Sequence, residues 1–257
     1  MEKIFVRGLY FDNVTMAEAL AFAEEAMGGE KLRTVFTPNA EIAEMCVENE
    51  DIRALISGAD LLLPDGAGVV MASKILGTPL KEKVAGIDFA EGVLALTEIL
   101  GKKVFLLGGK PKVAEMAKKN LTEKYPDLSI VGTCNGYFEK KGAENDAVLN
   151  EINKSGAEIL FVCLGAPAQE KWLAENKEKL ENIRLAAGLG GSLDVFAGIV
   201  RRAPKFFIDM KLEWFYRLLK EPRRIGRMMK LPKYILGAYR EKRKNCQNNR
   251  NRDELSN

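Results

Sequence analysis

The amino-acid sequence predicts a Rossmann-like α/β fold, in which helices cover both faces of a mainly parallel sheet, followed by a C-terminal amphipathic helical appendage. Three observations support this class. Short, continuously apolar runs alternate with helical patterns along residues 1–200, and most of these runs end in Gly, Pro or Asn. The chain of 257 residues is long enough to bury a large core. Its composition, 47% hydrophobic and 29% charged, excludes a disordered or fibrous protein.

The apolar runs are the predicted strands. They lack the alternation of a half-exposed strand, which indicates burial on both faces of the sheet. In chain order they occupy residues 33–36, 60–63, 104–107, 130–131, 159–162 and 183–187.

Helical patterns fill the segments between these strands. The first begins at Thr15, where Glu18 three residues later completes a capping box. The others cover about 39–57, 67–76, 88–100, 111–124, 143–154 and 168–181, and Pro126 and Gly156 mark two of their ends. Strands separated by helices of this length favour parallel pairing.

The pattern changes near 201–204, and the chain from Phe206 onward is helical and amphipathic. Pro222 and Pro232 are expected to divide this part into short helices. We therefore predict three regions: a Rossmann-like body at 1–200, a basic amphipathic helical appendage at 201–245, and a polar, disordered tail at 246–257.

Charge is distributed unevenly along the chain. Residues 200–257 carry 17 Lys and Arg against 6 Asp and Glu, whereas residues 1–199 carry 22 against 30. A basic segment of this kind favours phosphate groups, in anionic lipid or in nucleic acid. Because Trp214, Phe215 and Tyr216 lie within it, we interpret it as an interfacial helix attracted to an anionic membrane surface. The alternative is a helix packed on the body of its own or a neighbouring subunit.

The absence of histidine restricts the possible chemistry. It excludes Ser-His-Asp and Cys-His catalytic units and every metal site built on His. The four cysteines are scattered without a CxxC pair, which is typical of reduced thiols in a cytoplasmic protein. We find neither a signal peptide nor an apolar stretch that could cross a bilayer. Any acid–base chemistry must then be carried by a carboxylate, Lys, Tyr or Cys.

Residues that could bind a substrate follow the predicted strands, because ligands of open α/β sheets bind outside the carboxyl ends of the strands. Thr37 and Asn39 follow the first strand, and Asn39 is either a helix cap or a side chain facing the crevice. Asp65 follows the second strand beside Gly66 and Gly68, which let a ligand approach the backbone. Asp65 is our candidate general base, and the alternative is a helix N-cap.

Three further turns contain candidate ligands. Gly108 and Gly109 form a strand-to-helix turn whose amides suit a phosphate. Gln169 opens another helix, where its amide could bind a sugar or a base edge, and the neighbouring Glu170 is interpreted as complementing the helix dipole. Asp194 follows a glycine-rich stretch and either contacts a ligand hydroxyl or caps a helix.

The chain contains no Asp-x-Asp pair. A sugar-nucleotide enzyme without this pair would lack the usual ligands for the divalent metal ion that binds the diphosphate. We therefore expect no metal and no other cofactor. Arg and Lys would neutralise the leaving group instead. Arg217, Arg223, Arg224 and Arg227 in the basic segment offer such charges.

These motifs, taken in order, resemble those of the bacterial WecG/TagA/CpsF glycosyltransferases, most closely the TagA branch. The motifs are Thr37-Pro38-Asn39, Pro64-Asp65-Gly66, Val84-Ala85-Gly86-Ile87-Asp88, Leu107-Gly108-Gly109, Gly136-Tyr137-Phe138, 165–170, 188–194, Arg202-Ala203-Pro204, 213–217 and 221–224. The resemblance extends over nearly the whole chain, and the order and spacing of the motifs together make it specific.

The resemblance implies an enzyme that transfers N-acetylmannosamine (ManNAc), with inversion, from UDP-ManNAc to the 4-hydroxyl of the GlcNAc in undecaprenyl-diphosphate-GlcNAc. This step makes the linkage unit of wall teichoic acid. The resemblance also implies a homo-oligomer whose C-terminal appendage docks on the membrane and closes the site. Such an enzyme would be cytoplasmic and peripherally associated with the inner face of the plasma membrane.

Roles for individual residues are implied as well. Asp65 would remove the acceptor proton, and Thr37 and Asn39 would line the same pocket. Gln169 would bind substrate, and the arginines of the appendage would stabilise the departing UDP. Lys83 stands where the family pattern has Arg. At a phosphate contact, the single ammonium group of lysine would then replace a guanidinium group that can form two parallel hydrogen bonds.

Other functions fit the sequence less well. One alternative keeps the family and changes the donor, to UDP-ManNAc uronic acid or another UDP-sugar. A nucleic-acid binder is disfavoured, because the aromatic residues of the basic segment follow one helical stripe and no RNA-binding motif is recognisable. An NAD-type oxidoreductase is disfavoured because no predicted strand is followed by the dinucleotide glycine fingerprint.

Overall fold

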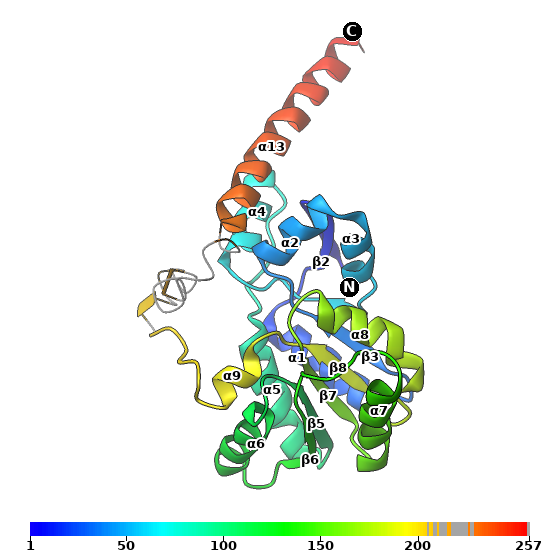
Figure 1. Ribbon diagram of the computed structural model, residues 1–257. Coiled ribbons are helices and arrows are strands. Elements are labelled where there is room, and N and C mark those ends of the chain that lie inside the picture. Colours follow the sequence, from blue (N-terminus) through cyan, green and yellow to red (C-terminus); the bar gives the residue numbers. More distant parts are fainter. Residues whose placement is uncertain (205, 208–209, 211–214, 217–225, 227–228, 256–257) are drawn as a thin grey trace.

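The computed structural model describes residues 1–204, 206–207, 210, 215–216, 226 and 229–255. Its centre is a six-stranded sheet (Figure 1) of β3 (Arg33–Phe36), β4 (Leu61–Leu62), β5 (Lys103–Gly108), β6 (Ser129–Cys134), β7 (Ile159–Cys163) and β8 (Leu185–Gly188). The strand order is β4-β3-β8-β7-β5-β6, and every neighbouring pair is parallel. A separate antiparallel hairpin consists of β1 (Lys3–Val6) and β2 (Leu9–Asp12). The predicted α/β class is confirmed.

Helices cover both faces of the sheet, because successive residues of each buried strand point to opposite faces. On one face, α1 (Met16–Gly28), α5 (Gly86–Ile99), α6 (Val113–Lys124) and α9 (Ser192–Phe196) share an apolar cluster with Val104 and Leu106 of β5. On the other face, α2 (Ala40–Glu48), α3 (Glu50–Ser57), α4 (Ala67–Leu76), α7 (Ala143–Ser155) and α8 (Ala168–Asn176) share a second cluster with Phe105 and Leu107. Both faces of the central strands β5, β7 and β8 are therefore buried, as their continuous apolar character indicates, whereas the edge strand β6 is only partly buried.

Most of the predicted helices are present, with small differences at their ends. The capping box forms as predicted, since the Thr15 Oγ1 accepts from the Glu18 N–H at 3.2 Å and the Glu18 carboxylate accepts from the Thr15 N–H at 2.7 Å. The helix predicted at 39–57 is instead two helices. Asn49 adopts an extended backbone there, and its Oδ1 accepts from the Ile52 N–H at 3.0 Å, which caps α3.

Two further segments differ from the prediction. The helix predicted at 168–181 ends early and is followed by a 3₁₀ turn at Lys177–Lys179. At the C-terminus, α13 (Lys230–Leu255) is one continuous helix that is longer than the short helices predicted there, and disorder of the tail at 246–257 stays a prediction. Pro232 lies in the first turn of α13, where a missing backbone N–H breaks no helical hydrogen bond, so it marks the start of this helix.

The N-terminal part of α13 packs against α2 and α4, and the rest of the helix extends away from the body (Figure 1). Tyr234 and Ala238 on its inner face are fully buried. Among the described residues, no helix combines the length and the apolar character that crossing a bilayer requires.

Candidate functional site

The candidate site lies along the carboxyl edge of the six-stranded sheet. Because the strands are parallel, the loops that follow β3, β4, β5, β7 and β8 all meet at this edge. The predicted site residues at the strand ends, on these loops or at the start of the following helices are Thr37, Asn39, Asp65, Gly108, Gly109, Gln169 and Asp194. Their contacts show which of these residues come together.

Thr37 is held between β8 and the start of α5. Its side chain is buried, and its Oγ1 donates to the Gly188 carbonyl oxygen at 3.1 Å. A Cβ placed on Gly86 would lie 2.9 Å from this Oγ1, so the first turn of α5 approaches Thr37 as closely as a glycine permits. The structure thus joins three motifs that are distant in the sequence.

Asn39 and Asp65 belong to loops that touch. Asn39 is the N-cap of α2, as one of the two interpretations expects: its Oδ1 accepts from the N–H groups of Glu41 at 2.9 Å and Ile42 at 3.1 Å. A Cβ on Gly66 would lie 3.6 Å from the Asn39 Cβ. Gly66 itself occupies the N-cap position of α4, so the interpretation of Asp65 as the N-cap residue is wrong. Asp65 is a partly buried residue in the loop that follows β4.

The segment before α5 borders the Asp65 loop. The Val84 N–H donates to the Pro64 carbonyl oxygen at 3.1 Å, which places the neighbouring Lys83 beside that loop. In the first turn of α5, Asp88 forms an ion pair of 2.6 Å with Arg202. Arg202 belongs to the start of the predicted appendage, so this ion pair attaches the root of the appendage next to the site.

Gln169 is buried, and both ends of its side-chain amide are engaged. Its Oε1 accepts from the Gly190 N–H at 2.9 Å, and its Nε2 donates to Glu170 Oε1 at 2.9 Å. The amide therefore holds the turn that follows β8, a structural role that the sequence does not predict. Binding of substrate by Gln169 stays a prediction.

Glu170 is a buried acid that sequence reasoning missed. It stands in the first turn of α8, as expected for a residue that complements the helix dipole, but it is only 1% exposed. Burial raises the pKa of its carboxyl group. Among the described residues, none forms a hydrogen bond with its Oε2. The polar composition of α8 contains no signal of this burial, because a charged side chain in a helix is usually solvated.

Gly108 and Gly109 allow β5 and β7 to approach closely. Gly108 has a φ of +132°, and a Cβ there would overlap the Cys163 carbonyl group. The Gly109 N–H donates to the Cys163 carbonyl oxygen at 3.1 Å, and the Gly136 N–H donates to the Gly109 carbonyl oxygen at 2.8 Å. This amide is therefore used within the fold, and the predicted phosphate contact would need other amides of the turn.

Asp194 lies in the first turn of α9, three residues after Gly191 at the N-cap position. A carboxylate in a first turn stabilises the positive end of the helix dipole. Its backbone carbonyl oxygen accepts from the N–H groups of Ile199 and Val200 at 3.0 Å, which folds the end of the body back onto α9. Contact with a ligand hydroxyl stays a prediction.

The cysteines are free thiols, as the sequence predicts. Burial raises the pKa of Cys46 and of Cys163 to about 12, so both stay protonated at neutral pH and are poor nucleophiles and metal ligands. Within the part of the chain that the structure describes, no group of three His, Cys, Asp or Glu side chains could hold a metal ion. Independence from metal stays a prediction.

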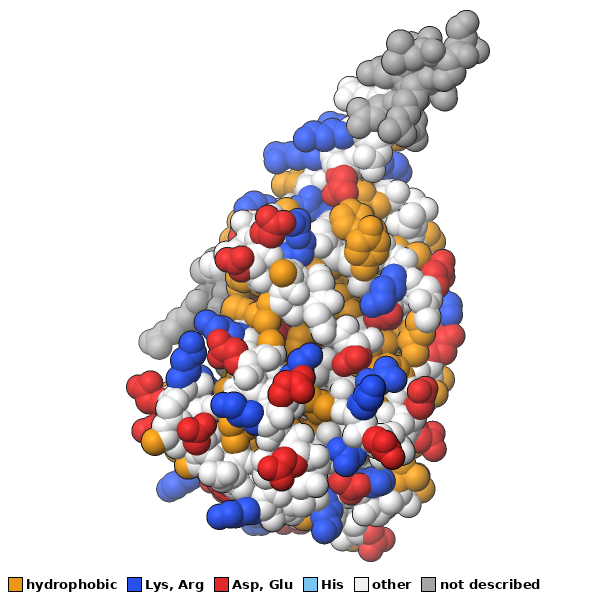
Figure 2. Space-filling model, turned by 90° about the vertical axis from the view of Figure 1, so that its right-hand side faces the viewer, with side chains coloured by type: hydrophobic (Ala, Val, Ile, Leu, Met, Phe, Trp, Pro, Cys, Tyr) orange, Lys and Arg blue, Asp and Glu red, His pale blue; other side chains and the backbone are white. Residues whose placement is uncertain are grey.

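The predicted leaving-group contacts of the appendage, Arg217, Arg223, Arg224 and Arg227, lie outside the described residues. The described part of the basic segment is mainly α13. Figure 2 shows Lys and Arg side chains gathered along this helix where it leaves the body, whereas the body surface in that view carries charges of both signs. The exposed cations of α13 include Arg240, Lys242, Arg243 and Lys244.

Known proteins match this chain over most of its length. The sequence profile of the "Glycosyl transferase WecG/TagA/CpsF family" matches residues 4–248. A Bacillus subtilis protein named N-acetylglucosaminyldiphosphoundecaprenol N-acetyl-beta-D-mannosaminyltransferase is 33% identical over 244 residues, which cover 95% of this chain and 93% of that protein. A Bacillus spizizenii protein of the same name is 37% identical over 209 residues, covering 81% and 79% of the two chains. A third, from Staphylococcus aureus, is 33% identical over 244 residues, covering 94% of each.

The matched region contains every predicted site residue, in the body and in the appendage. Both the family profile and the relatives describe glycosyl transfer. The chain is therefore a glycosyltransferase, and it belongs to the WecG/TagA/CpsF family.

Proposed function

We propose that this chain transfers ManNAc from UDP-ManNAc to the 4-hydroxyl of the GlcNAc in undecaprenyl-diphosphate-GlcNAc, with inversion at the anomeric carbon, to make the linkage unit of wall teichoic acid. The observation that carries the proposal is the match along nearly the whole chain to relatives whose name states mannosaminyl transfer to N-acetylglucosaminyldiphosphoundecaprenol. The site supports it, because a carboxylate and an amide lie on touching loops at the carboxyl edge of the sheet, where ligands of this fold class bind.

Inversion requires a single displacement at the anomeric carbon. The acceptor 4-oxygen forms its bond on the face opposite to UDP, while the bond from the carbon to the UDP oxygen breaks and its electron pair leaves with the diphosphate. The acceptor hydroxyl gives its proton to a general base, and Asp65 is assigned to this step. The assignment is supported by the partial burial of Asp65 in the loop that follows β4, in a chain without histidine.

The departing UDP accumulates negative charge as the bond breaks. Arginine side chains can stabilise that charge without a metal ion, and the arginines of the appendage named above are assigned to this role. Lys83 beside the Asp65 loop is assigned to a phosphate contact, and Thr37, Gln169 and Asp194 to substrate binding. The ion pair between Arg202 and Asp88 supports the scheme, because it holds the beginning of the appendage against the first turn of α5, next to the site.

The acceptor is a lipid, so the enzyme has to act at a membrane surface. We assign membrane binding to the basic appendage, with the enzyme peripherally attached to the cytoplasmic side of the plasma membrane as a homo-oligomer. The exposed Lys and Arg side chains of α13 support this assignment, since each such cation near an anionic surface adds attraction. Turnover is expected to be the same with and without EDTA, and partners are expected to include no nucleic acid.

The test measures UDP release from UDP-ManNAc with a lipid-diphosphate-GlcNAc acceptor. Asp65→Asn is compared with the wild type and with Asp127→Asn, an exposed aspartate before β6 at the opposite edge of the sheet. We expect Asp65→Asn to lose about 10²–10⁴-fold in kcat with an unchanged circular dichroism spectrum, and Asp127→Asn to match the wild type. Near-normal turnover by Asp65→Asn would place the base elsewhere. If the wild type uses UDP-ManNAc uronic acid and not UDP-ManNAc, the proposed donor is wrong.

A further inference from the structure

α13 contacts both helices that begin at the site. α2 starts directly after Asn39, and α4 starts directly after the Asp65 loop. α13 packs against both of them. The three helices meet at Gly68, in the first turn of α4, where a Cβ would overlap Leu231 of α13 and lie 2.8 Å from the Cβ of Ala40 in α2. The end of α4 that follows Asp65 is therefore in direct contact with α13.

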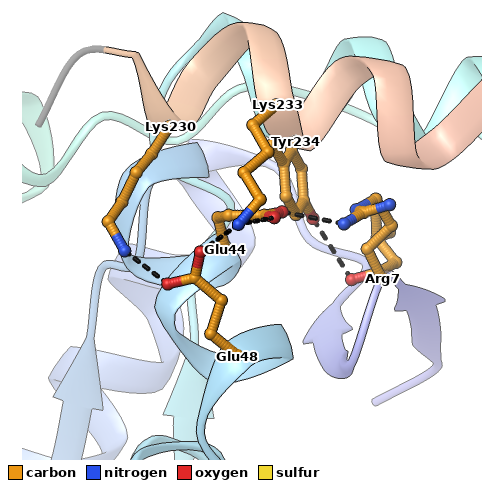
Figure 3. Close-up of polar contacts among 7 residues, drawn as sticks. Arg7, Glu44, Glu48, Lys230, Lys233 and Tyr234 are labelled. Carbon is orange, nitrogen blue, oxygen red and sulfur yellow. Dashed lines mark hydrogen bonds and ion pairs between the residues drawn. The ribbon is translucent and has the colours of Figure 1, made fainter.

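A buried polar contact holds the same part of α13 in place (Figure 3). Arg7, in the turn between β1 and β2, pairs with Glu44 of α2 at 2.8 Å, and their side chains are 9% and 2% exposed. Tyr234 of α13 covers this pair: its ring centroid lies 5.0 Å from the Arg7 guanidinium carbon, and its hydroxyl donates to the Val6 carbonyl oxygen at 3.2 Å. A Cβ on Gly237, one turn later, would overlap the Arg7 guanidinium. α13 thus excludes water from the ion pair.

Two lysines of α13 complete the contact. Lys230 pairs with Glu48 at 2.6 Å, and Lys233 pairs with the same carboxylate and lies 3.6 Å from Glu44. Hydrogen bonds from Lys230 and then Lys233 lower the pKa of Glu48 to about 2. Charge therefore matches α13 to α2, and the close approach at Gly68 fits it to α4. We call the surface formed by Arg7, Glu44, Glu48 and Gly68 the α13 seat.

We propose that α13 is a positioning element of the active site: its docking in the seat holds the first turns of α2 and α4, and with them Asn39 and Asp65, in the geometry that turnover requires. The inference rests on the proposed function, because it takes Asp65 as a reacting group. A displacement of about 1 Å at a catalytic group can lower a rate by about 10²-fold. Tyr234 and Arg7 would then control turnover without touching the substrate. Membrane attachment is a separate property, carried by the exposed face of α13.

Two tyrosines of α13 provide a matched pair for the test. Tyr234 is fully buried in the seat, whereas Tyr239 is 52% exposed on the same helix. With the full-length chain and a water-soluble, short-chain GlcNAc-diphosphate acceptor, we expect Tyr234→Ala to lower kcat by about tenfold or more with an unchanged KM for UDP-ManNAc. Tyr239→Ala should keep the wild-type kcat. Flotation with vesicles containing phosphatidylglycerol should be the same for Tyr234→Ala as for the wild type. Wild-type kcat in Tyr234→Ala, or an equal loss in both variants, would overturn the proposal.

Hydrogen exchange tests the same inference without catalysis. Tyr234→Ala should speed amide exchange in α2 and α4, while α6, on the opposite face of the sheet, keeps its wild-type rates. Unchanged exchange in α2 and α4 would overturn the proposal. If the wild type does not turn over UDP-ManNAc, the proposed function fails, and the exchange rates still decide whether α13 orders these helices. Should Tyr234→Ala not fold, Gly237→Ala displaces Arg7 through its added Cβ and is expected to show the same exchange pattern and kcat loss.

Discussion

Removing one partner of the buried Arg7–Glu44 ion pair should destabilise the protein strongly, whereas replacing both partners should not. The two groups are 2.8 Å apart and nearly inaccessible to solvent beneath α13. Loss of one partner leaves a buried charge without its counter-ion, which costs about 3–5 kcal/mol of unfolding free energy. An apolar pair of similar volume avoids the desolvation of both charges and is close to neutral.

Neighbouring groups adjust the expected cost of each single variant. In Arg7→Met, Glu44 keeps Lys233 as a partner at 3.6 Å, so we expect the lower end of the range, about 3 kcal/mol. The cost does not vanish, because this lysine is 59% exposed and compensates the buried charge only in part. In Glu44→Leu, Arg7 keeps the ring of Tyr234, but its Nε has no hydrogen-bond partner among the described residues, so we expect about 4–5 kcal/mol. The double variant Arg7→Met/Glu44→Leu should lie within about 1 kcal/mol of the wild type.

Urea denaturation followed by circular dichroism at pH 7 measures the four proteins of this double-mutant cycle. The exposed pair of Arg53 and Glu50 is the matched control, because its side chains are 40% and 83% exposed and each single replacement there should cost less than about 1 kcal/mol. Additive effects at Arg7 and Glu44, or single losses as small as those of the control pair, would refute the conclusion that α13 desolvates a paired charge.

Three other properties can be measured directly. Gly86→Ala should lower the midpoint of thermal denaturation, by the equivalent of about 1–3 kcal/mol, because its Cβ would lie 2.9 Å from Thr37 Oγ1; an unchanged midpoint would contradict this close approach. The folded-state pKa of Glu48, about 2, lies below its unfolded value of about 4.5, so its stabilisation is complete above pH 4.5 and is lost as the pH falls towards 2. Glu48→Gln should therefore cost stability at pH 7 and progressively less below pH 4.5 in urea denaturation, and a pH-independent cost would argue against the pairing with Lys230 and Lys233. Thiol labelling of the native protein at pH 8 should modify exposed Cys246 rapidly and reach Cys46 and Cys163 only after denaturation, since burial raises the pKa of both to about 12; equal rates at all cysteines would exclude this burial.

Local sequence patterns were sufficient to predict most elements of the body. The runs at 104–107 and 159–162 became β5 and β7, because a short segment that is apolar on both faces is stable only in the centre of a covered sheet. The break within 39–57 was missed, although Asn49 followed by Glu50 and Asp51 is a helix-start signal. The β1–β2 hairpin was also missed, since its strands are only four residues long and one face of each is partly exposed.

The location of the candidate site was predictable for a topological reason. Parallel strands place their carboxyl ends at one edge, so residues that follow different strands, such as Thr37 and Asp65, had to meet there. Their individual contacts were not predictable. The amide of Gln169 is engaged by Gly190 and Glu170, and the burial of Glu170 results from how α8 packs on the sheet.

The sequence by itself determined the fold class, the family resemblance and the edge of the sheet that carries the site. Only the tertiary structure decided that α13 rests on the two helices beginning at that edge. The hydrogen bond from Tyr234 to Val6 joins residues 228 positions apart. Strand runs and helix caps depend on residues within a few positions of each other, so they are visible in the sequence. The partners of a distant side chain depend on how whole helices pack, and no local pattern specifies that packing.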